Sequence, residues 1–271
     1  MAWTYFCHST SRARASPDAE VLERRVLLAS TAVGPSPGEV VQRVTQVYVG
    51  GTAWTTAFKD FLEAGGVGDG AYGYALSTPF GDLRELPWSN INQVSVRFAE
   101  DQTVARDDLT VASATGKAYA VTAFAYDPDD DVATWTFDKP LADFGAGGRG
   151  AADDVRFLLT DRGGAGGAAG GTALHLFRVR VVPGDANRSG AVTPADYGLV
   201  RSGVGRNTAD VGTTPRDYTA FKDVNGDGAV SPADLGVVRG NAGAVLPRFP
   251  GAAAVFPTGG ATGDLFGDRR V

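Results

Sequence analysis

Two similar acidic loops, 38 positions apart, constrain the last third of this 271-residue chain more than any other feature. Loop 1 runs from Asp185 to Asp196 and loop 2 from Asp223 to Asp234, and both loops end in Pro-Ala-Asp. A period of about 20–50 residues is typical of repeated supersecondary units. The period therefore predicts two copies of one small loop-and-helix unit, packed as a pair.

Both loops follow the spacing of a calcium-binding loop. Such a loop of about 12 residues offers oxygen atoms from positions 1, 3, 5, 7 and 12, with glycine at position 6. In loop 1 the corresponding residues are Asp185, Asn187, Ser189, the Ala191 carbonyl and Asp196. In loop 2 they are Asp223, Asn225, Asp227, the Ala229 carbonyl and Asp234. An all-oxygen set suits a hard cation, so we predict two bound calcium ions.

The two loops differ in ligand charge. Loop 2 has three carboxylates among these positions, whereas loop 1 has two, because Ser189 stands where loop 2 has Asp227. More ligand charge gives tighter calcium binding. We therefore predict that loop 2 binds calcium more tightly than loop 1.

Short helices are predicted after both loops. Pro194 and Pro232 stand where proline opens a helix, and Thr213 to Phe221 reads as a capped connecting helix. The residues before loop 1, Arg178 to Pro183, are strand-like, so the unit lacks the entering helix of a full EF-hand.

This order of loops and helices resembles type I dockerin domains over residues 183–245. The resemblance implies a small all-α domain with tandem EF-hand-like loops, which folds on calcium and binds a cohesin-like module. Dockerins anchor enzymes and other proteins to scaffolds for polysaccharide breakdown. The resemblance also implies a partner-facing surface, for which the candidate residues here are Pro194, Ala195, Tyr197, Pro232, Ala233 and Leu235. The family often has hydroxyl residues where this chain has Pro-Ala, which puts a standard cohesin partner in doubt. The alternative is a purely structural calcium staple.

Residues 44–182 are predicted to be a β-rich domain with one inserted helix. Trp54 to Ala64 has apolar residues on one helical face, and Gly65-Gly66 ends that pattern. Alternating or apolar runs predict seven strands: Thr45–Val49, Asn92–Phe98, Leu109–Val111, Tyr119–Tyr126, Val132–Phe137, Val155–Leu159 and Ala173–Val182. Short strands separated by turns favour a sandwich. The stretches 94–111 and 126–141 are similar to bacterial Ig-like domains, which implies an Ig-like β-sandwich and a mainly β chain.

The two ends of the chain are predicted to be non-globular. In residues 1–43, Leu22, Glu23, Arg25, Leu27 and Leu28 resemble the LEPR-XLL motif of bacterial surface and secreted proteins, with Arg24 in place of its proline. That resemblance implies sorting to the cell envelope or exterior; the alternative is a disordered tail with a chance match. The apolar run at 26–29 is shorter than the core of a usual signal peptide. Residues 246–271 read as an extended tail.

Composition excludes several classes of function. The single cysteine, Cys7, permits no internal disulfide or cysteine-built zinc site, and two histidines make a histidine-rich metal site improbable. The net charge of −6 argues against nucleic acid as a partner, and no run is long enough for a transmembrane segment. Acidic residues at 100–101, 107–108 and 129–131 are better interpreted as turn and cap residues than as a glycosidase pair.

We therefore expect a non-catalytic extracellular or cell-surface protein. In this interpretation the dockerin-like unit binds a cohesin-like module or another surface scaffold, and the β-sandwich is a spacer or binder. The alternative is a carbohydrate-binding accessory module with a calcium staple, in which Trp54, Trp88 and Trp135 stack on polysaccharide. Exposure of two of these tryptophans on one face would favour that alternative.

Overall fold

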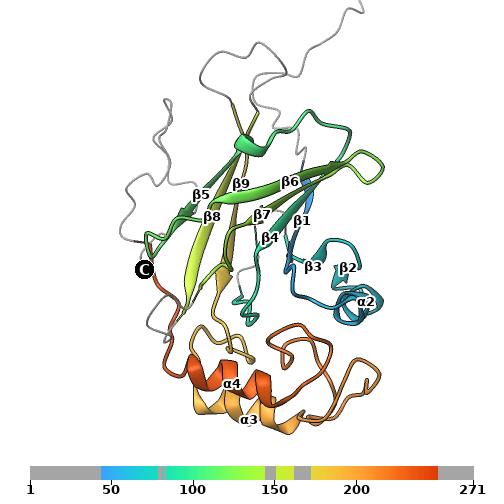
Figure 1. Ribbon diagram of the computed structural model, residues 1–271, viewed down its shortest axis with the longest axis vertical. Coiled ribbons are helices and arrows are strands. Elements are labelled where there is room, and N and C mark those ends of the chain that lie inside the picture. The colour runs from blue at the N-terminus through green and yellow to red at the C-terminus, as the bar shows by residue number, and fades with distance from the viewer. Residues whose placement is uncertain (1–43, 79–80, 82–83, 144–150, 162–171, 250–271) are drawn as a thin grey trace, which may run out of the picture. The chain divides into compact units, whose positions relative to one another are not determined.

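Two antiparallel sheets form most of the segment predicted to be a β-sandwich, as Figure 1 shows. This computed structural model describes residues 44–78, 81, 84–143, 151–161 and 172–249. In spatial order, the larger sheet contains β2 (Gly68–Asp69), β3 (Gly73–Ala75), β1 (Val44–Gly50), β4 (Gln93–Phe98), β7 (Val132–Phe137) and β6 (Val121–Asp127). The smaller sheet contains β5 (Leu109–Ser113), β8 (Asp153–Asp161) and β9 (Thr172–Val181). A 3-10 turn, η1 (Arg106–Asp108), precedes β5.

The seven predicted strands are all present, each bounded within two residues of its prediction. Alternation explains the success: in the register of β4 with β7, Val94 pairs with Trp135 and Val96 with Ala133. All four side chains are fully buried. A strand that buries every second residue against a facing layer is readable from its sequence alone.

Aromatic side chains fill the space between the two sheets. The ring centroids of Phe137 in the larger sheet and Phe157 in the smaller sheet are 6.0 Å apart. Phe157 stacks on Phe177 of β9 at 4.9 Å, and the fully buried Trp135 of β7 packs against Phe124 of β6 at 5.2 Å. Each buried aromatic side chain stabilises the fold by about 1.5–3 kcal/mol relative to an exposed one. These contacts join the sheets into a two-layer sandwich.

A helix and two short strands are inserted between β1 and β4. Helix α2 (Thr56–Ala64) begins two residues after its predicted start, since Thr55 is the N-cap and its side chain accepts from the Phe58 N–H. Its buried face carries Phe58 and Leu62, as the helical period predicts. The short strands β2 and β3 were not predicted, because glycines build them: a Cβ at Gly68 would lie 2.4 Å from a backbone oxygen of β3.

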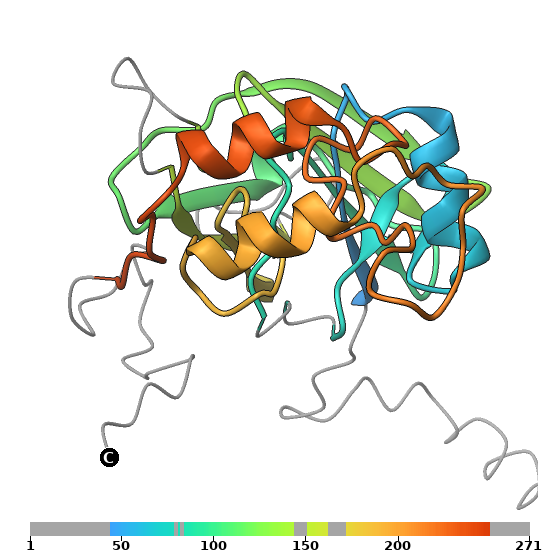
Figure 2. The same cartoon turned by 90° about the horizontal axis from the view of Figure 1, so that it is seen from below.

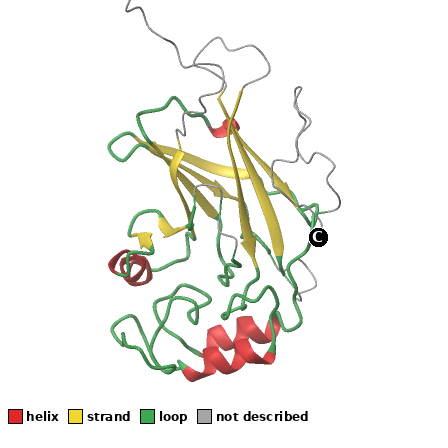
Figure 3. Cartoon of the chain, turned by 180° about the vertical axis from the view of Figure 1, so that it is seen from behind, coloured by secondary structure: helices red, strands yellow, loops and turns green. Residues whose placement is uncertain are grey.

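The repeat contributes two nine-residue helices, α3 (Pro194–Ser202) and α4 (Pro232–Gly240), which lie side by side in Figures 1 and 2. Both begin at the predicted proline. Figure 3, which is coloured by secondary structure, shows α3 and α4 as a helical layer beyond the end of the sheets, on the side of α2.

The predicted connecting helix from Thr213 to Phe221 is wrong, because this stretch contains turns, bends and irregular loop and no helix. Its carbonyl groups have other partners than an α-helix would supply. The Nζ of buried Lys222 donates to the Pro215 carbonyl at 2.8 Å and to the Asp217 carbonyl at 2.6 Å. In an α-helix these carbonyl groups would accept from backbone N–H groups four residues later. Here they accept from the Lys222 side chain instead.

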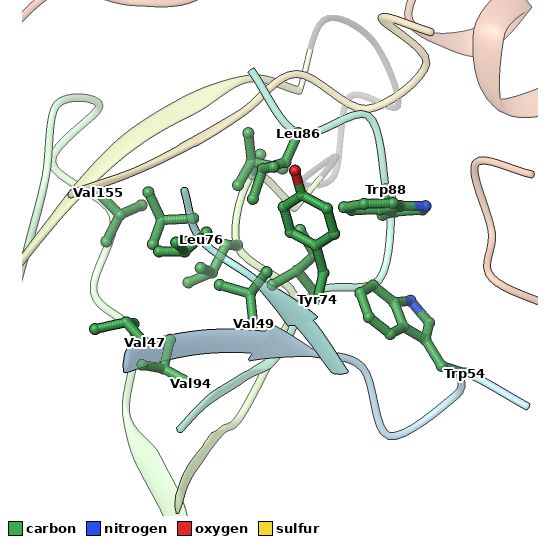
Figure 4. Packing of buried hydrophobic residues seen from close by; sticks show 14 of the residues in the cluster. Val47, Val49, Trp54, Tyr74, Leu76, Leu86, Trp88, Val94 and Val155 are labelled. Atoms are coloured by element: carbon green, nitrogen blue, oxygen red, sulfur yellow. The ribbon is translucent and has the colours of Figure 1, made fainter. Parts of the chain in front are cut away.

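The sandwich and the repeat share one hydrophobic cluster. Tyr218 and Phe221, which precede loop 2, pack edge-on against Phe61 of α2 and Tyr74 of β3, at 4.8 and 6.1 Å between centroids. Trp88 is fully buried, and its Nε1 donates to the Ala220 carbonyl at 3.1 Å. In Figure 4, Trp54, Tyr74 and Trp88 gather at one end of this cluster.

Several predictions fall outside what the structure describes. They are the N-terminal segment 1–43 with its LEPR-XLL-like motif and residues 250–271 of the predicted tail. Within the described ranges, no helix combines the length and apolar character needed to cross a bilayer.

Candidate metal centre

Loop 1 follows β9 and runs into α3, and loop 2 runs into α4. The position-1 and position-12 aspartates of both loops are completely buried, and all four turn toward backbone N–H groups of their own loop. These residues are Asp185, Asp196, Asp223 and Asp234.

In loop 2 the carboxylate of Asp223 organises the turn. Its Oδ1 accepts from the Gly226 N–H at 2.8 Å and the Asp227 N–H at 3.2 Å. Its Oδ2 accepts from the Gly228 N–H at 2.8 Å and from the Tyr218 hydroxyl at 2.7 Å. These charge-assisted hydrogen bonds hold the backbone of loop 2 folded around the Asp223 carboxylate.

The other aspartates of loop 2 complete the ring. Asp234 accepts from the Asn225 N–H at 3.2 Å through Oδ1 and from the Ser231 N–H at 2.8 Å through Oδ2. Asp227 is exposed, and its carboxylate accepts from the Ala229 N–H and from Asn225 Nδ2, both at 2.9 Å. The donor atoms of positions 1, 3, 5 and 12 therefore lie along one short loop.

Loop 1 repeats this arrangement with one carboxylate fewer. Asp185 accepts from the Ser189 N–H at 2.9 Å and the Gly190 N–H at 2.7 Å. Asp196 accepts from the Asn187 N–H at 3.0 Å. The Ser189 hydroxyl, at the position of Asp227, lies 3.2 Å from the Ala191 carbonyl. The two loops thus share a backbone frame and differ in charge.

The last candidate ligand of each loop also takes part in capping the following helix. Thr193 and Ser231 are the N-caps of α3 and α4, and their side chains accept from the N–H groups of Ala195 and Ala233. Asp196 and Asp234, three residues later, close the capping box. The spacing of hydroxyl, Pro-Ala and Asp therefore serves helix initiation and ligand placement together.

Glycine occupies position 6 in both loops for a conformational reason. Gly190 and Gly228 have φ values of 90° and 92°, in the region that side chains other than glycine rarely adopt. Position 4 is also left-handed, with φ 60° at Arg188 and 71° at Gly226. Arg188 adopts this conformation while its Nε donates to the Glu85 carbonyl at 2.7 Å.

The buried carboxylates are electrostatically costly without a cation beside them. Burial, with the nearby carboxylates of Asp234 and Asp227, raises the pKa of Asp223 to about 7. Burial likewise raises the pKa values of Asp185 and Asp234. Burying ionised carboxylates is unfavourable unless they are paired or coordinate a metal, so these loops fit a divalent cation.

The chemistry of the donors selects the class of cation. Among the residues that the structure describes, no three acidic, histidine or cysteine side chains converge on one point as a metal-binding group. A cation here would depend on mixed oxygen donors: carboxylates, the amides of Asn187 and Asn225, and the carbonyls of Ala191 and Ala229. Such a set fits calcium, which accepts carbonyl and amide oxygen in flexible geometry.

Each loop is clasped by the chain that follows a helix. The Val192 N–H of loop 1 donates to the Ala244 carbonyl, after α4, at 2.8 Å. The Val230 N–H of loop 2 donates to the Arg206 carbonyl, after α3, also at 2.8 Å. This exchange extends to Leu246, whose N–H donates to the Gly190 carbonyl at 2.9 Å. The repeat is therefore one interlocked unit rather than two independent loops.

Sequence reasoning missed the residues that stand behind the loops. Tyr218 donates to Asp223, and its own pKa is raised by burial and by that carboxylate. Behind loop 1, Glu85 pairs with Arg180 at 2.6 Å and lies 3.3 Å from where a Cβ of Gly190 would be. Tyr218 and Arg180 stand five residues before each loop, a spacing that could have been compared between the copies.

The predicted partner-facing residues divide by exposure. Pro194, Ala195, Pro232 and Ala233 are exposed at the starts of α3 and α4. Tyr197 and Leu235 are partly buried and pack against the core cluster. Arg239 of α4 lies over the Tyr197 ring, 4.9 Å from its centroid, which joins the two helices.

Comparison with known proteins identifies the repeat alone. The family model described as the dockerin type I domain matches residues 183–241. No curated protein and no solved structure matches the chain.

Proposed function

Because residues 183–241 are a type I dockerin domain, we propose that this chain uses them to anchor itself to a cohesin-like protein module. Anchoring of this kind serves polysaccharide-degrading or cell-surface assemblies, so the proposed location is extracellular or on the cell envelope. The observation that carries the proposal is the pair of loops with four fully buried ligand carboxylates, followed by two helices whose first turns stay exposed.

Two calcium ions are proposed as the cofactors, one in each loop. Loop 1 would hold its ion with Asp185, Asn187, Ser189, Ala191 and Asp196, and loop 2 with the five corresponding residues. Calcium would supply the positive charge that compensates the buried carboxylates, and loop 2, with the additional carboxylate of Asp227, is proposed as the tighter site.

The proposed partner surface is the outer side of α3 and α4. Both helices start with an exposed Pro-Ala, and both carry an exposed arginine in the last turn, Arg201 and Arg239. Proline and alanine side chains donate no hydrogen bonds. The partner is therefore proposed to contact this surface through apolar groups and through acidic groups that pair with the arginines.

A non-catalytic, Ig-like spacer is proposed for residues 44–182. The strand orders β1-β4-β7-β6 and β5-β8-β9 support an Ig-like topology, since they correspond to the ABED and CFG sheets of that fold. Several of the acidic residues have structural partners: Asp108 accepts from the Ala105 N–H, and Asp130 accepts from the Tyr72 hydroxyl. These roles favour turn and cap residues over a catalytic pair.

The carbohydrate-binding alternative loses its predicted platform. Trp88 and Trp135 are fully buried, and Trp54 is 5% exposed, so none of them offers a face on which a sugar ring could stack. Polysaccharide binding would have to use other residues.

Binding of the full chain to a panel of cohesin modules, with calcium and with chelator, tests the proposal. We expect calcium-dependent binding that is lost when Ala195→Glu and Ala233→Glu are combined, because two carboxylates would repel the acidic groups proposed for the partner. Ala125→Glu, at an exposed alanine on β6, is the matched control and is expected to bind normally. Binding that ignores chelator or the double substitution would contradict the proposal. Retention on insoluble polysaccharide alone would favour the alternative.

A further inference from the structure

Loop 2 is built against the β-rich part of the chain through its backbone. Three consecutive carbonyl groups, at positions 2, 3 and 4 of the loop, accept hydrogen bonds from residues far earlier in the sequence. The Val224 carbonyl accepts from the Ser89 N–H at 2.9 Å, and the Gly226 carbonyl accepts from the Thr55 N–H at 3.0 Å. Between them, the Asn225 carbonyl accepts from Asn90 Nδ2 at 2.6 Å.

The orientation of the Asn90 amide follows from its neighbours. Trp54 Nε1 can only donate, and it donates to Asn90 Oδ1 at 2.6 Å. The Asn225 carbonyl can only accept, so it faces the amide nitrogen. The Trp54 ring also covers Gly226, where an added Cβ would lie 2.4 Å from the indole. Trp54 and Asn90 therefore form a clamp on positions 3 and 4 of loop 2.

Each peptide unit held by the clamp also donates its N–H group to a candidate ligand carboxylate. The unit whose carbonyl faces Asn90 presents the Gly226 N–H to Asp223 Oδ1 at 2.8 Å. A peptide is planar, so fixing its carbonyl also fixes the direction of its N–H group. The clamp on the outside of the loop therefore sets where the Asp223 carboxylate is held on the inside.

The flanking peptide units work in the same way. The unit bonded to Ser89 presents the Asn225 N–H to Asp234 Oδ1 at 3.2 Å. The unit bonded to Thr55 presents the Asp227 N–H to Asp223. Asp223 is thus connected to the sandwich side of the molecule through two peptide units, and Asp234 through one.

Loop 1 meets the same part of the chain with the opposite hydrogen-bond polarity. There the repeat donates: the Gly184 N–H bonds the Pro87 carbonyl at 2.8 Å, and Arg188 Nε bonds the Glu85 carbonyl. Gly184 precedes the first ligand, and Arg188 uses its side chain. These contacts hold the start and the rim of loop 1 without orienting the peptide units that face its carboxylates.

We propose that Thr55, Ser89 and Asn90 are the outer shell of the loop 2 metal site, so that calcium binding there is coupled to the stability of the β-sandwich. The proposal rests on the proposed calcium site in loop 2 and on no protein partner. Residues behind metal ligands orient them, and losing one typically weakens metal binding about 10- to 100-fold. Coupling is reciprocal, so calcium in loop 2 stabilises the core on which the clamp is built.

Calorimetric titration of the full chain with calcium alone tests the first half. Asn90→Asp keeps the acceptor for Trp54 but replaces the donor that faces the Asn225 carbonyl, and we expect loop 2 binding to weaken about 10- to 100-fold. Asn92→Asp is the matched control for the added charge, because among the contacts described the Asn92 side chain bonds only Thr52, between β1 and α2, and not loop 2. Equal affinities in both variants would overturn the proposal.

Hydrogen exchange of the unsubstituted chain tests the second half and needs no variant. Calcium is expected to slow exchange in strand β4 as well as in loop 2, at concentrations that fill the tighter site. Protection confined to loop 2 would overturn the coupling. The absence of any calcium binding would instead overturn the proposed metal site itself, whereas failure to bind cohesin modules would leave this inference intact.

Discussion

Loop 1 and loop 2 have the same ligand spacing, the same left-handed position 4 and the same capped helix behind them. Their sequences differ at positions 2, 4, 5 and 9, and the differences at positions 4 and 5 change charge and side-chain size most. Position 4 is Arg188 in loop 1 and Gly226 in loop 2, and position 5 is Ser189 in loop 1 and Asp227 in loop 2. The residue without a side chain is the one that Trp54 covers, and the loop with the additional acid is the one bonded to the sandwich through three carbonyls.

The groups behind the first ligand differ in the same direction. Tyr218 donates directly to Asp223 at 2.7 Å. Arg180, at the equivalent place before loop 1, pairs with Glu85 instead. Both loops contribute two buried residues to the core cluster, so the copies keep one backbone frame while they meet the rest of the chain through different groups. Neighbouring residues, rather than ligand spacing, set this difference.

Removal of a ligand charge should separate the loops most strongly. Asp223→Asn keeps one acceptor oxygen for the loop N–H groups but removes the buried charge, so the tighter calcium event should weaken at least about 100-fold. Asp185→Asn should abolish only the weaker event. Calorimetry of both variants measures this, and a tight event that survives Asp223→Asn would reverse the assignment.

Substitution of position 4 by alanine should give the second largest difference between the loops, measured in the free energy of unfolding. Gly226→Ala forces a Cβ to 2.4 Å from Trp54 at a φ of 71°, and we expect a loss of about 2–3 kcal/mol in the free energy of unfolding. Arg188→Ala introduces no new Cβ and should cost about 1 kcal/mol, through its lost contact with Glu85. Urea unfolding with calcium present measures both. Equal losses would mean that Trp54 does not clamp loop 2.

Low pH should weaken calcium binding by loop 2, because the pKa of Asp223 is raised. In the metal-free folded chain that pKa is about 7, above the value of about 3.9 of an unfolded aspartate. Between these values the folded chain holds a proton that the unfolded chain has lost, so metal-free stability falls as pH rises through this window. Calcium must displace the same proton, so its affinity should fall about tenfold per pH unit below about 7.

Calorimetry of loop 2 at several pH values measures the affinity, and denaturation of the calcium-free chain measures the stability. In Asp223→Asn the downward slope of metal-free stability should shrink. An affinity that is constant from pH 5 to pH 7 would contradict the prediction.

The smallest effect should be the same in both copies. Thr193→Ala and Ser231→Ala each remove an N-cap hydroxyl, and we expect each to cost about 1 kcal/mol in the free energy of unfolding. Thermal denaturation measures this. A much larger loss for Ser231→Ala would extend the difference between the loops to their helices.

Short-range patterns explain which parts of the fold were predictable. Alternation placed β4 and β7, and Thr193 and Ser231 followed by Pro-Ala placed the starts of α3 and α4, because each signal lies within a few residues. The prediction of a connecting helix was wrong because the Pro215 and Asp217 carbonyl groups accept hydrogen bonds from the Lys222 side chain. A local sequence pattern does not record such a contact.

By itself, the sequence determined the loops, their candidate ligands, the expectation that loop 2 is the tighter site and the β-rich character of residues 44–182. Only the tertiary structure decided that Thr55, Ser89 and Asn90 hold loop 2 and that the two parts share one core. The physical reason is separation along the chain. Asn90 and Asn225 are 135 positions apart, and a contact over that distance leaves no period, cap or spacing in the sequence.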